Sequence, residues 1–218
     1  TFGDGVATVF SIQLYLGSRD VLAQFYDTST LLELATTFLE RTDVDTITDI
    51  IGRDSRIGLE YLRAGVVYGG PCFPRDVFAM ATLPNSVFFR NVSHTNEASM
   101  IDLKIAIRDL DGIIGILGLP YKVGSDVTDG ALGWNLYSDF KQNRRVVTDF
   151  NRSVEFVVSE SDIVVVALDD PLYRALPDKV WGRPGEKPRI VFDCWRSLGR
   201  LAQVNGVDYR PIGIGRSK

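Results

Sequence analysis

The chain has 218 residues, 45% of them hydrophobic and 24% charged, and a formal net charge of -4. These values suit a globular protein that buries a core as one large domain or two small ones, and the acidic balance argues against the broad basic face that nucleic-acid binding needs. The two cysteines lack CxxC spacing and no apolar run is long enough to span a bilayer, so we expect no disulfide framework, no metal site, no membrane segment and a cytoplasmic location.

The first third of the sequence is predicted to be helical. Apolar residues recur at helical spacing over residues 21–38, and a shorter amphipathic stretch over 44–51 ends at Gly52, a frequent helix stop. A further long helix is predicted over 96–110, where apolar residues again form one stripe. The sequence therefore indicates a helical region that extends to residue 110.

A loop with unusual composition interrupts this helical region. Residues 64–76 contain two adjacent glycines and two prolines, which favour an irregular backbone whose amides can approach a ligand. Helix is expected to resume at Arg75 or Asp76 and to continue to Ala81. Cys72 then lies just before a helix amino terminus, where the helix dipole and Arg75 favour the thiolate, and Asp76 lies within reach to orient a water or take a proton. A buried structural cysteine in a tight turn would explain the same spacing, so both interpretations stay open.

The pattern of apolar residues changes after residue 110, where continuous apolar runs appear. Continuous apolar runs are typical of parallel strands that are buried on both faces. They alternate with short helical patterns, which indicates right-handed βαβ units and an open parallel sheet. The predicted strands are 112–119, 145–148, 162–168 and 189–193, and the predicted helices are 131–140 and 154–159. The fold class is therefore α/β.

Several segments carry a resemblance to a known family. Around the loop they read R-D-S-R-I-G at 53–58, Y-L-R-A-G at 61–65 and Y-G-G-P-C-F-P-R-D at 68–76. Further along the chain follow G-I-L-G-L-P-Y-K at 115–122 and D-C-W-R at 193–196. In order and spacing, these segments resemble the central and C-terminal domains of the UDP-glucose/GDP-mannose dehydrogenase family, in particular UDP-glucose 6-dehydrogenase.

The resemblance implies an NAD-dependent oxidation at C6 of a UDP-sugar, from alcohol to carboxylate, through a cysteine thiohemiacetal and a thioester. Cys72 matches the nucleophile, since a thiolate can attack a carbonyl carbon and later leave, and Asp76 matches the carboxylate of the hydrolytic step. The positions that match residues binding the anionic nucleotide sugar are Arg56, Leu62, Arg63, Gly69, Lys122 and Arg196. The Cys-Phe-Pro sequence of the loop favours UDP-glucose over other sugar nucleotides.

By the same resemblance, the chain has a helical dimerisation region followed by a Rossmann-like open parallel sheet domain. Residues 1–110 would form the central helical region with the cysteine loop, and residues 111–218 the domain that binds the nucleotide sugar. The expected partners are a UDP-sugar and a second copy of the chain. In the homodimer, the apolar stripe over residues 22–38 would be buried.

Three departures from the family pattern concern NAD or the stabilisation of an oxyanion. No strand is followed by G-x-G-x-x-G, so we expect the NAD-binding site outside this chain, in a separate domain or subunit. The family's lysine and asparagine align with Tyr15 and Arg19, and its R-E-S motif aligns with residues 128–130. The alternative function is therefore a catalytically relaxed sugar-nucleotide-binding or scaffold protein. A hydrolase or transferase that uses Cys72 is a third candidate.

Overall fold

The computed structural model describes residues 10–14, 21–25, 43–60, 62, 65, 67–183, 185 and 187–213. The fold divides into two compact units, one of residues 1–62 with 213–218 and one of residues 63–212. The compact units are thus separated after residue 62, whereas a boundary between functional domains at residue 110 stays a prediction.

The smaller unit combines a strand pair with a short helix. Strands β1 (Phe10–Leu14) and β2 (Val21–Phe25) pair antiparallel, with Phe10 opposite Phe25. The helix predicted from residue 21 is therefore wrong over 21–25, and residues 26–38 lie outside the described residues. A short apolar run fits a strand as well as a helix, and here antiparallel pairing with β1 decides between them.

Helix α2 (Val44–Gly52) confirms the second predicted helix. It begins at Asp43, whose carboxylate accepts a hydrogen bond from the backbone N–H of Asp45 at 2.8 Å. Such a side chain satisfies one of the free amides of a first helical turn. Val44 and Ile47 point inward from this helix and are buried.

The larger unit starts with a helical hairpin. Helix α3 (Phe73–Ala81) begins two residues before the predicted start at Arg75, because a proline is tolerated in the first turn, where no intrahelical N–H bond is lost. Helix α4 (Val87–Arg108) begins well before its predicted start at Asn96. Its first half is rich in β-branched and aromatic residues, which have poor helix propensity, and packing against α3 compensates for this.

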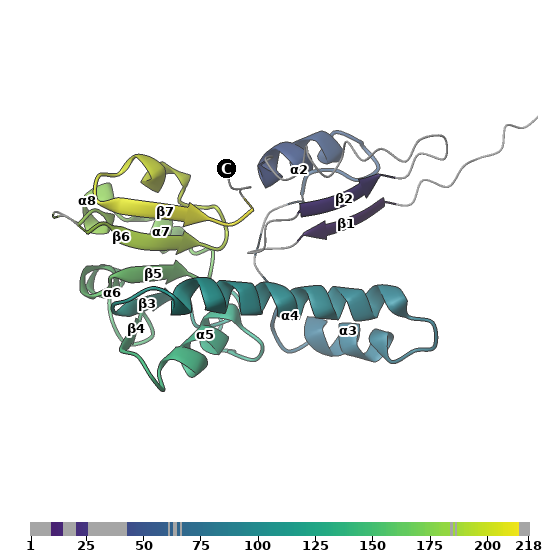
Figure 1. Ribbon diagram of the computed structural model, residues 1–218, viewed down its shortest axis with the longest axis horizontal. Helices are drawn as coiled ribbons and strands as arrows, with labels where there is room; N and C mark the ends of the chain where they lie inside the picture. Colours follow the sequence, from purple (N-terminus) through teal and green to yellow (C-terminus); the bar gives the residue numbers. More distant parts are fainter. Residues whose placement is uncertain are drawn as a thin grey trace, which may run out of the picture. The chain divides into compact units, whose positions relative to one another are not determined.

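Five parallel strands form the sheet of the larger unit (Figure 1). They are β3 (Ile114–Leu117), β4 (Val146–Thr148), β5 (Ile163–Val166), β6 (Arg189–Asp193) and β7 (Val207–Pro211). Their spatial order is β4-β3-β5-β6-β7, and every neighbouring pair is parallel. The predicted α/β class and four of the strands are confirmed, while β7 was not predicted.

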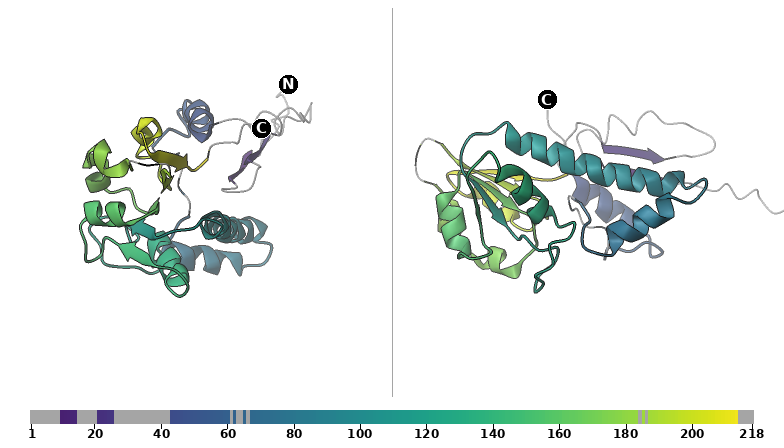
Figure 2. Two further views of the ribbon diagram at one scale, coloured as in Figure 1. Left: turned by 60° about the vertical axis from the view of Figure 1, so that its left-hand side comes forward. Right: turned by 90° about the horizontal axis from the view of Figure 1, so that it is seen from below.

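Helices lie on both faces of this sheet (Figure 2). The helices are α5 (Leu132–Phe140), α6 (Val154–Glu160), α7 (Pro171–Ala175) and α8 (Asp178–Trp181), with a 3-10 turn, η1 (Gly199–Gln203). Right-handed crossovers put α5 on one face and the other helices on the opposite face. The core on that opposite face joins Leu117, Val164 and Val191 from the strands with Val157, Trp181 and Leu201 from the helices.

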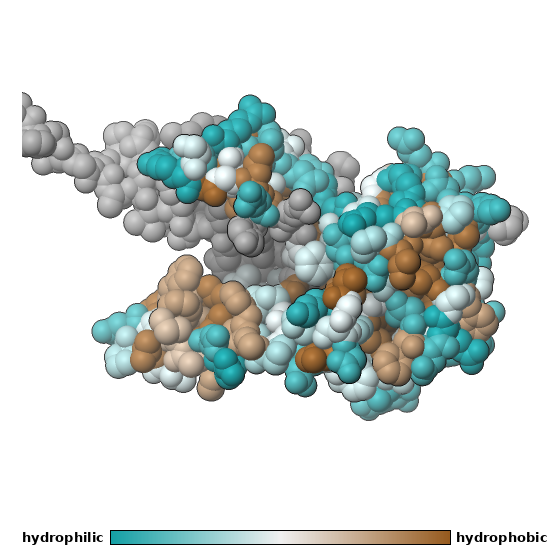
Figure 3. All heavy atoms as spheres, turned by 180° about the vertical axis from the view of Figure 1, so that it is seen from behind, coloured by the Kyte–Doolittle hydropathy of each residue, from teal (hydrophilic) through white to brown (hydrophobic). Residues whose placement is uncertain are grey.

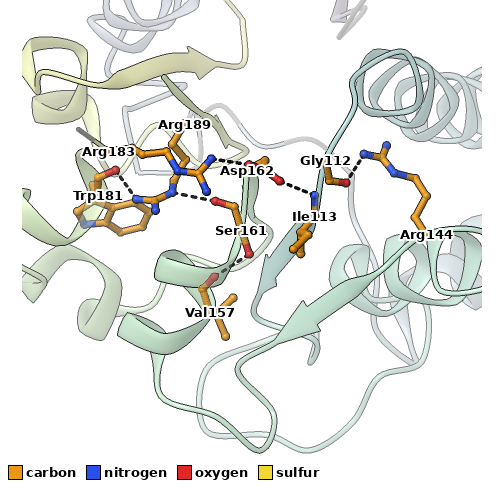
Figure 4. A network of polar contacts seen from close by, with 9 residues as sticks. All are labelled: Gly112, Ile113, Arg144, Val157, Ser161, Asp162, Trp181, Arg183 and Arg189. Atoms are coloured by element: carbon orange, nitrogen blue, oxygen red, sulfur yellow. Dashed lines mark hydrogen bonds and ion pairs between the residues drawn. The ribbon is translucent and has the colours of Figure 1, made fainter. Parts of the chain in front are cut away.

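A chain of polar contacts joins the amino ends of the strands (Figure 4). Asp162 accepts a hydrogen bond from the backbone N–H of Ile113 at 2.8 Å and forms an ion pair with Arg183. Burial raises the pKa of Asp162, but hydrogen bonds from Arg183 and Ile113 outweigh it and lower the pKa overall.

Arg189 is buried and donates to three backbone carbonyls, those of Ser161, Val180 and Trp181. Burial and the charge of Arg183 lower the pKa of Arg189 to about 10. The polar groups at the amino ends of the strands therefore pair with one another and stabilise the fold.

Candidate functional site

The opposite, carboxyl edge of the sheet is where a ligand site is expected. In a sheet of this strand order, the connections leave neighbouring strands β3 and β5 in opposite directions, and the crevice between their carboxyl ends is the usual ligand site. The segments at this edge are the loop of residues 118–131 after β3, residues 167–170 after β5 and the turn of residues 194–198 after β6. The segment that holds Cys72 packs against two of them.

The two adjacent glycines of the cysteine loop contact the loop after β3 directly. A Cβ atom on Gly69 would lie 2.1 Å from the carbonyl oxygen of Gly130, so only a glycine fits this approach. Gly70 has a φ of +86°, and its Cα faces the ring of Tyr121, 2.7 Å from where a Cβ would stand. The predicted irregular loop is thus confirmed, and its glycines hold the segment just before Cys72 against the loop that carries Lys122.

Cys72 is the N-cap residue of α3 and is exposed. Its carbonyl oxygen accepts the N–H of Asp76 at 3.0 Å, which starts the helix, and its side chain makes no capping hydrogen bond. The interpretation of Cys72 as a buried structural residue is therefore wrong. Cys194 behaves in the opposite way: it is fully buried after β6, and burial together with the charge of Asp193 raises the pKa of its thiol.

Asp76 lies in the first turn of α3, beside Arg75. The Arg75 Nε lies 3.0 Å and its Nη2 2.9 Å from Oδ1 of Asp76, and both side chains are exposed. The hydrogen bond to Asp76, its charge and the charge of Cys72 raise the pKa of Arg75. The first turn of α3 therefore presents a thiol, a guanidinium and a carboxylate within four residues of each other.

Asn96 also contributes to this loop, and we did not predict it. Its Oδ1 accepts the backbone N–H of Tyr68 at 2.9 Å, and its Nδ2 donates to the carbonyl oxygen of Tyr68 at 3.2 Å. The ring of Tyr68 in turn packs edge-on against Phe73 at the start of α3, with 4.8 Å between centroids. We predicted Asn96 as the first residue of a helix, whereas it lies in the middle of α4. An asparagine inside a helix is poorly favoured, which is the signal that could have identified it.

Lys122 and Arg196 extend from two loops of the same edge. Lys122 is exposed, and its Nζ lies 5.4 Å from the centroid of the Tyr121 ring. Arg196 has a φ of +55° and donates to the carbonyl oxygen of Ile212 at 2.7 Å. The neighbouring Trp195 donates from Nε1 to the carbonyl oxygen of Ala167 at 3.0 Å, and its ring lies next to Gly65, 3.3 Å from where a Cβ on Gly65 would stand. The cysteine segment therefore contacts both ligand-site loops.

Three further predicted binding residues are Arg56, Leu62 and Arg63. Arg56 and Leu62 are part of the smaller unit, and Arg63 lies outside the described residues. Arg56 is exposed and pairs with Asp54, with 2.5 Å between Nη2 and Oδ2. The side-chain hydrogen bond from Arg56 lowers the pKa of Asp54 to about 2. The role of these residues toward a ligand stays a prediction.

The β3–α5 connection does not form a dinucleotide cradle. A dinucleotide cradle needs a strand, a short glycine turn and a helix amino terminus in direct succession. In the described sheet, 14 residues (118–131) separate β3 from α5, and the glycine at 115 lies inside the strand, facing Ser161. The same part of the chain places no group of His, Cys, Asp and Glu side chains so that it could hold a metal ion. None of its helices is long and apolar enough to cross a membrane.

Two surface hollows lie at the amino edge rather than at the cysteine loop. Both are lined by Lys179, Gly182 and Arg183, next to the closed polar network of Figure 4. They are open to solvent and share no residue with the cysteine segment. These two hollows are therefore separate from the segment that holds Cys72.

Comparisons with known proteins agree with this geometry. The sequence model of the UDP-glucose/GDP-mannose dehydrogenase family, central domain, matches residues 33–98, which include the cysteine loop. UDP-glucose 6-dehydrogenase YwqF of Bacillus subtilis is 26% identical over 204 residues, which cover 78% of this chain and 45% of that protein. UDP-glucose 6-dehydrogenase AglM of Haloferax volcanii is 28% identical over 192 residues, covering 76% of this chain and 43% of that protein. The chain thus spans less than half the length of these relatives.

A solved structure shows the same fold. The UDP-glucose dehydrogenase of the hyperthermophilic archaeon Pyrobaculum islandicum superimposes with a TM-score of 0.63 at 20% sequence identity, over 78% of this chain and 43% of that one. The chain therefore has the Rossmann-like fold of that structure and, through the sequence matches, is related to the UDP-glucose/GDP-mannose dehydrogenase family.

Proposed function

We propose that this chain supplies the nucleotide-sugar site and the nucleophile of an NAD-dependent UDP-sugar 6-dehydrogenase, with UDP-glucose as the substrate. One observation carries the proposal: Gly69 and Gly70 seat the Cys72 segment directly on the loop of Tyr121 and Lys122. A thiol and a cation then adjoin one ligand site at the carboxyl edge of the sheet. Its relatives YwqF and AglM are both UDP-glucose 6-dehydrogenases.

The proposed chemistry uses the first turn of α3. The C6 alcohol of the sugar first loses a hydride and its hydroxyl proton to give an aldehyde, to which the Cys72 thiolate adds. The resulting thiohemiacetal then loses a second hydride to give a thioester. By the family resemblance NAD would accept both hydrides, and we place its binding site outside this chain. Asp76 then activates a water that hydrolyses the thioester to the carboxylate and restores the thiol. Its exposed position and the neighbouring Arg75 are compatible with this role.

Cations bind the diphosphate of the substrate in this proposal. Lys122 is exposed on the loop after β3, where its ammonium can reach an anionic ligand. Arg196 lies after β6, and Arg56, Leu62, Arg63 and Gly69 complete the proposed set. These assignments come from the family pattern, and the contacts of Gly69 with the β3–α5 loop support the part of the set that lies in the larger unit.

We further propose that the chain acts as a homodimer in the cytoplasm. The α3–α4 hairpin exposes large apolar side chains that would be stabilised by association, including Phe78 and Phe88, which are 67% and 71% exposed (Figure 3). The interface predicted on residues 22–38 no longer rests on a helical stripe, since residues 21–25 form a strand. Both cysteines are free, which suits a reducing compartment.

The competing candidate is a sugar-nucleotide-binding protein that has lost the oxidation step. Tyr15 and Arg19 stand where the family pattern has a lysine and an asparagine, and the sequence contains no lysine before Lys104. This departure would remove the group that stabilises the developing oxyanion, while leaving the nucleotide site unchanged. Binding without turnover is the expected behaviour of such a protein.

The test is a calorimetric titration of the chain with UDP-glucose, UDP and GDP-mannose, with and without NAD, while absorbance reports NADH. UDP-glucose binding together with NADH formation supports the dehydrogenase. Binding without NADH is consistent with a substrate half that needs a separate NAD-binding domain or subunit, and with the relaxed binding protein. No binding of any nucleotide contradicts both and leaves the scaffold role.

Two variants localise the result. Lys122→Ala should weaken UDP-glucose binding about tenfold or more, because it removes a charge-assisted contact to phosphate. Lys179→Ala is the matched control, because Lys179 is exposed at the amino edge of the same sheet. Equal loss of binding in both variants would place the nucleotide elsewhere. Cys72→Ser should retain UDP-glucose binding and abolish any NADH formation that the unmodified chain shows.

A further inference from the structure

The carboxamide of Asn96 binds both backbone polar groups of one residue in the cysteine loop, Tyr68. It accepts the N–H of Tyr68 at 2.9 Å and donates to the carbonyl oxygen of the same residue at 3.2 Å. This side chain pairs with the loop backbone as a neighbouring β-strand would. Asn96 lies in the middle of α4, 28 residues from Tyr68 in sequence and half-buried, so α4 fixes the start of the loop.

The other side of the same loop is fixed by the segment after β3. Gly69 approaches the carbonyl oxygen of Gly130, and Gly70 lies against the ring of Tyr121. Tyr68, Gly69 and Gly70 are consecutive, so the chain just before Cys72 is held between α4 and the segment that carries Lys122. Without the two hydrogen bonds of Asn96, the loop would keep its contacts with Tyr121 and Gly130. The path of its backbone toward α3 would no longer be fixed.

We propose that Asn96 is a positioning residue, which holds the Cys72 thiol beside the ligand that Lys122 binds. The inference rests on the proposed function for the identity of that ligand, but not for the position of the loop. Asn96 touches neither ligand nor thiol in this arrangement. Its effect reaches Cys72 through the backbone of residues 68–72.

Hydrogen exchange in the ligand-free chain tests the position of the loop. Asn96→Ala should accelerate exchange of the peptide around Tyr68 and Gly69 about tenfold, since it removes one hydrogen bond to the exchanging amide. Asn91→Ala is the matched control, because Asn91 is an exposed asparagine of the same helix. Asn96→Asp keeps an acceptor for the Tyr68 N–H, so exchange should stay closer to that of the unmodified chain. Unchanged exchange in Asn96→Ala would overturn the inference.

Protection of Cys72 from iodoacetamide by UDP-glucose tests the consequence for the thiol. In the unmodified chain, saturating UDP-glucose should slow alkylation of Cys72 about tenfold or more. In Asn96→Ala the dissociation constant should change by less than about threefold, while the protection falls below about twofold. A purely structural loss would weaken binding and protection together. Full protection in Asn96→Ala would overturn the inference.

The two readouts separate this inference from the proposed function. If the unmodified chain shows no protection by UDP-glucose, the proposed ligand is wrong, and the exchange of residues 67–72 alone decides whether Asn96 positions the loop. If UDP-glucose protects Cys72 in the unmodified chain, and hydrogen exchange around Tyr68 accelerates in Asn96→Ala but not in Asn91→Ala, the proposed ligand and the role of Asn96 are both supported. If Asn96→Ala does not fold, Asn96→Leu, which has a similar volume but no donor or acceptor, should accelerate the same exchange.

Discussion

The carboxylate of Asp193, at the carboxyl end of β6, accepts a hydrogen bond from the hydroxyl of Tyr209 on the neighbouring strand β7, with 2.8 Å between Oδ2 and the phenol oxygen. The same carboxylate accepts the backbone N–H groups of Trp195 at 3.0 Å and Leu198 at 2.7 Å. Asp193 is fully buried, so no water can replace these donors. The carboxylate of Asp193 therefore fixes the conformation of the turn that carries Arg196, and the hydroxyl of Tyr209 links this carboxylate to β7.

This arrangement predicts unequal effects for its two partners. Tyr209→Phe should lower the free energy of unfolding by about 1 kcal/mol, since one hydrogen bond is lost and both backbone donors keep theirs. Asp193→Ala should lower it by about 3 kcal/mol or more, because it leaves buried donors without an acceptor. Urea unfolding measures both. In Asp193→Ala the turn is released, and UDP-glucose affinity should fall as well; equal effects of the two substitutions would contradict this account.

The buried guanidinium of Arg189 supports a second prediction. Its donors serve three backbone carbonyls, at 3.0 Å for Ser161, 3.0 Å for Val180 and 2.5 Å for Trp181. Arg189→Ala should lower the free energy of unfolding by about 3 kcal/mol or more, because these carbonyls are left without partners. Arg145→Ala is the control, since Arg145 is exposed and forms one surface ion pair with Glu160. That change should cost less than about 1 kcal/mol, and a similar loss in both would show that the carbonyl contacts contribute little.

The hydroxyl of Tyr173 predicts a pH dependence. It donates to Oδ2 of Asp149 at 2.5 Å, and Asp149 also accepts the N–H of Gly118 at the end of β3. Burial first, and then the charge of Asp149, raise the pKa of Tyr173 above the ordinary value of 10.0. The stability that this contact provides is thus fully present below pH 10 and is lost as the pH rises further, because the unfolded chain releases the phenol proton and the native chain keeps it.

Stability measured against pH checks this. Between pH of about 8 and 9.5, Tyr173→Phe should be less stable than the unmodified chain by about 1–3 kcal/mol. Above pH of about 10 the difference should shrink by up to about 1.4 kcal/mol per pH unit. A difference that stays constant through this range would mean that the native phenol ionises as easily as the unfolded one.

Most of the sheet could be predicted from the sequence because its central strands are local signals. Every residue of Ile114–Leu117 and of Ile163–Val166 is buried, so each strand is a continuous apolar run that no other element explains as well. Strand β7 has no such signal. It is an edge strand whose residues are all half-buried and alternate between apolar and polar types, and only its pairing with β6 identifies it. Strand β2 was mistaken for a helix because a short apolar run fits either structure, and only its pairing with β1 decides between them.

The candidate site shows the same division between local and distant signals. Cys72, its helix and Asp76 are contiguous, so the glycines, the prolines and the charges around them predicted the site together. The contact of Asn96 with Tyr68 spans 28 residues, and that of Gly69 with Gly130 joins segments on opposite sides of α4 in the sequence. No local pattern encodes either contact, because both depend on how α4 and β3 pack.

The two cysteines predict a selective modification. Cys72 is exposed, whereas Cys194 is fully buried and has a raised pKa, caused by burial and by the charge of Asp193. Iodoacetamide at pH of about 8 should therefore place one adduct on the native chain, at Cys72, and a second only after unfolding. Peptide mapping by mass spectrometry identifies the site. Modification of Cys194 in the native chain at a comparable rate would show that the strand end opens readily.

The approach of Gly69 to Gly130 predicts how the site responds to a single methyl group. In Gly69→Ala the new Cβ would lie 2.1 Å from a carbonyl oxygen, and because that atom belongs to the backbone, one of the two loops must move. The free energy of unfolding should fall by about 1–3 kcal/mol. UDP-glucose affinity should fall with it, since the cysteine segment separates from the loop of Lys122.

Gly199→Ala provides the comparison, because a Cβ at residue 199 meets no atom within 4 Å. It should change the stability by less than about 1 kcal/mol, in either direction, since it mainly restricts the unfolded chain. Calorimetry with UDP-glucose on both variants then separates the general effect of an added methyl from the effect of displacing the loop. Normal affinity in Gly69→Ala, despite the lost stability, would mean that the nucleotide site does not depend on the seating of the cysteine segment.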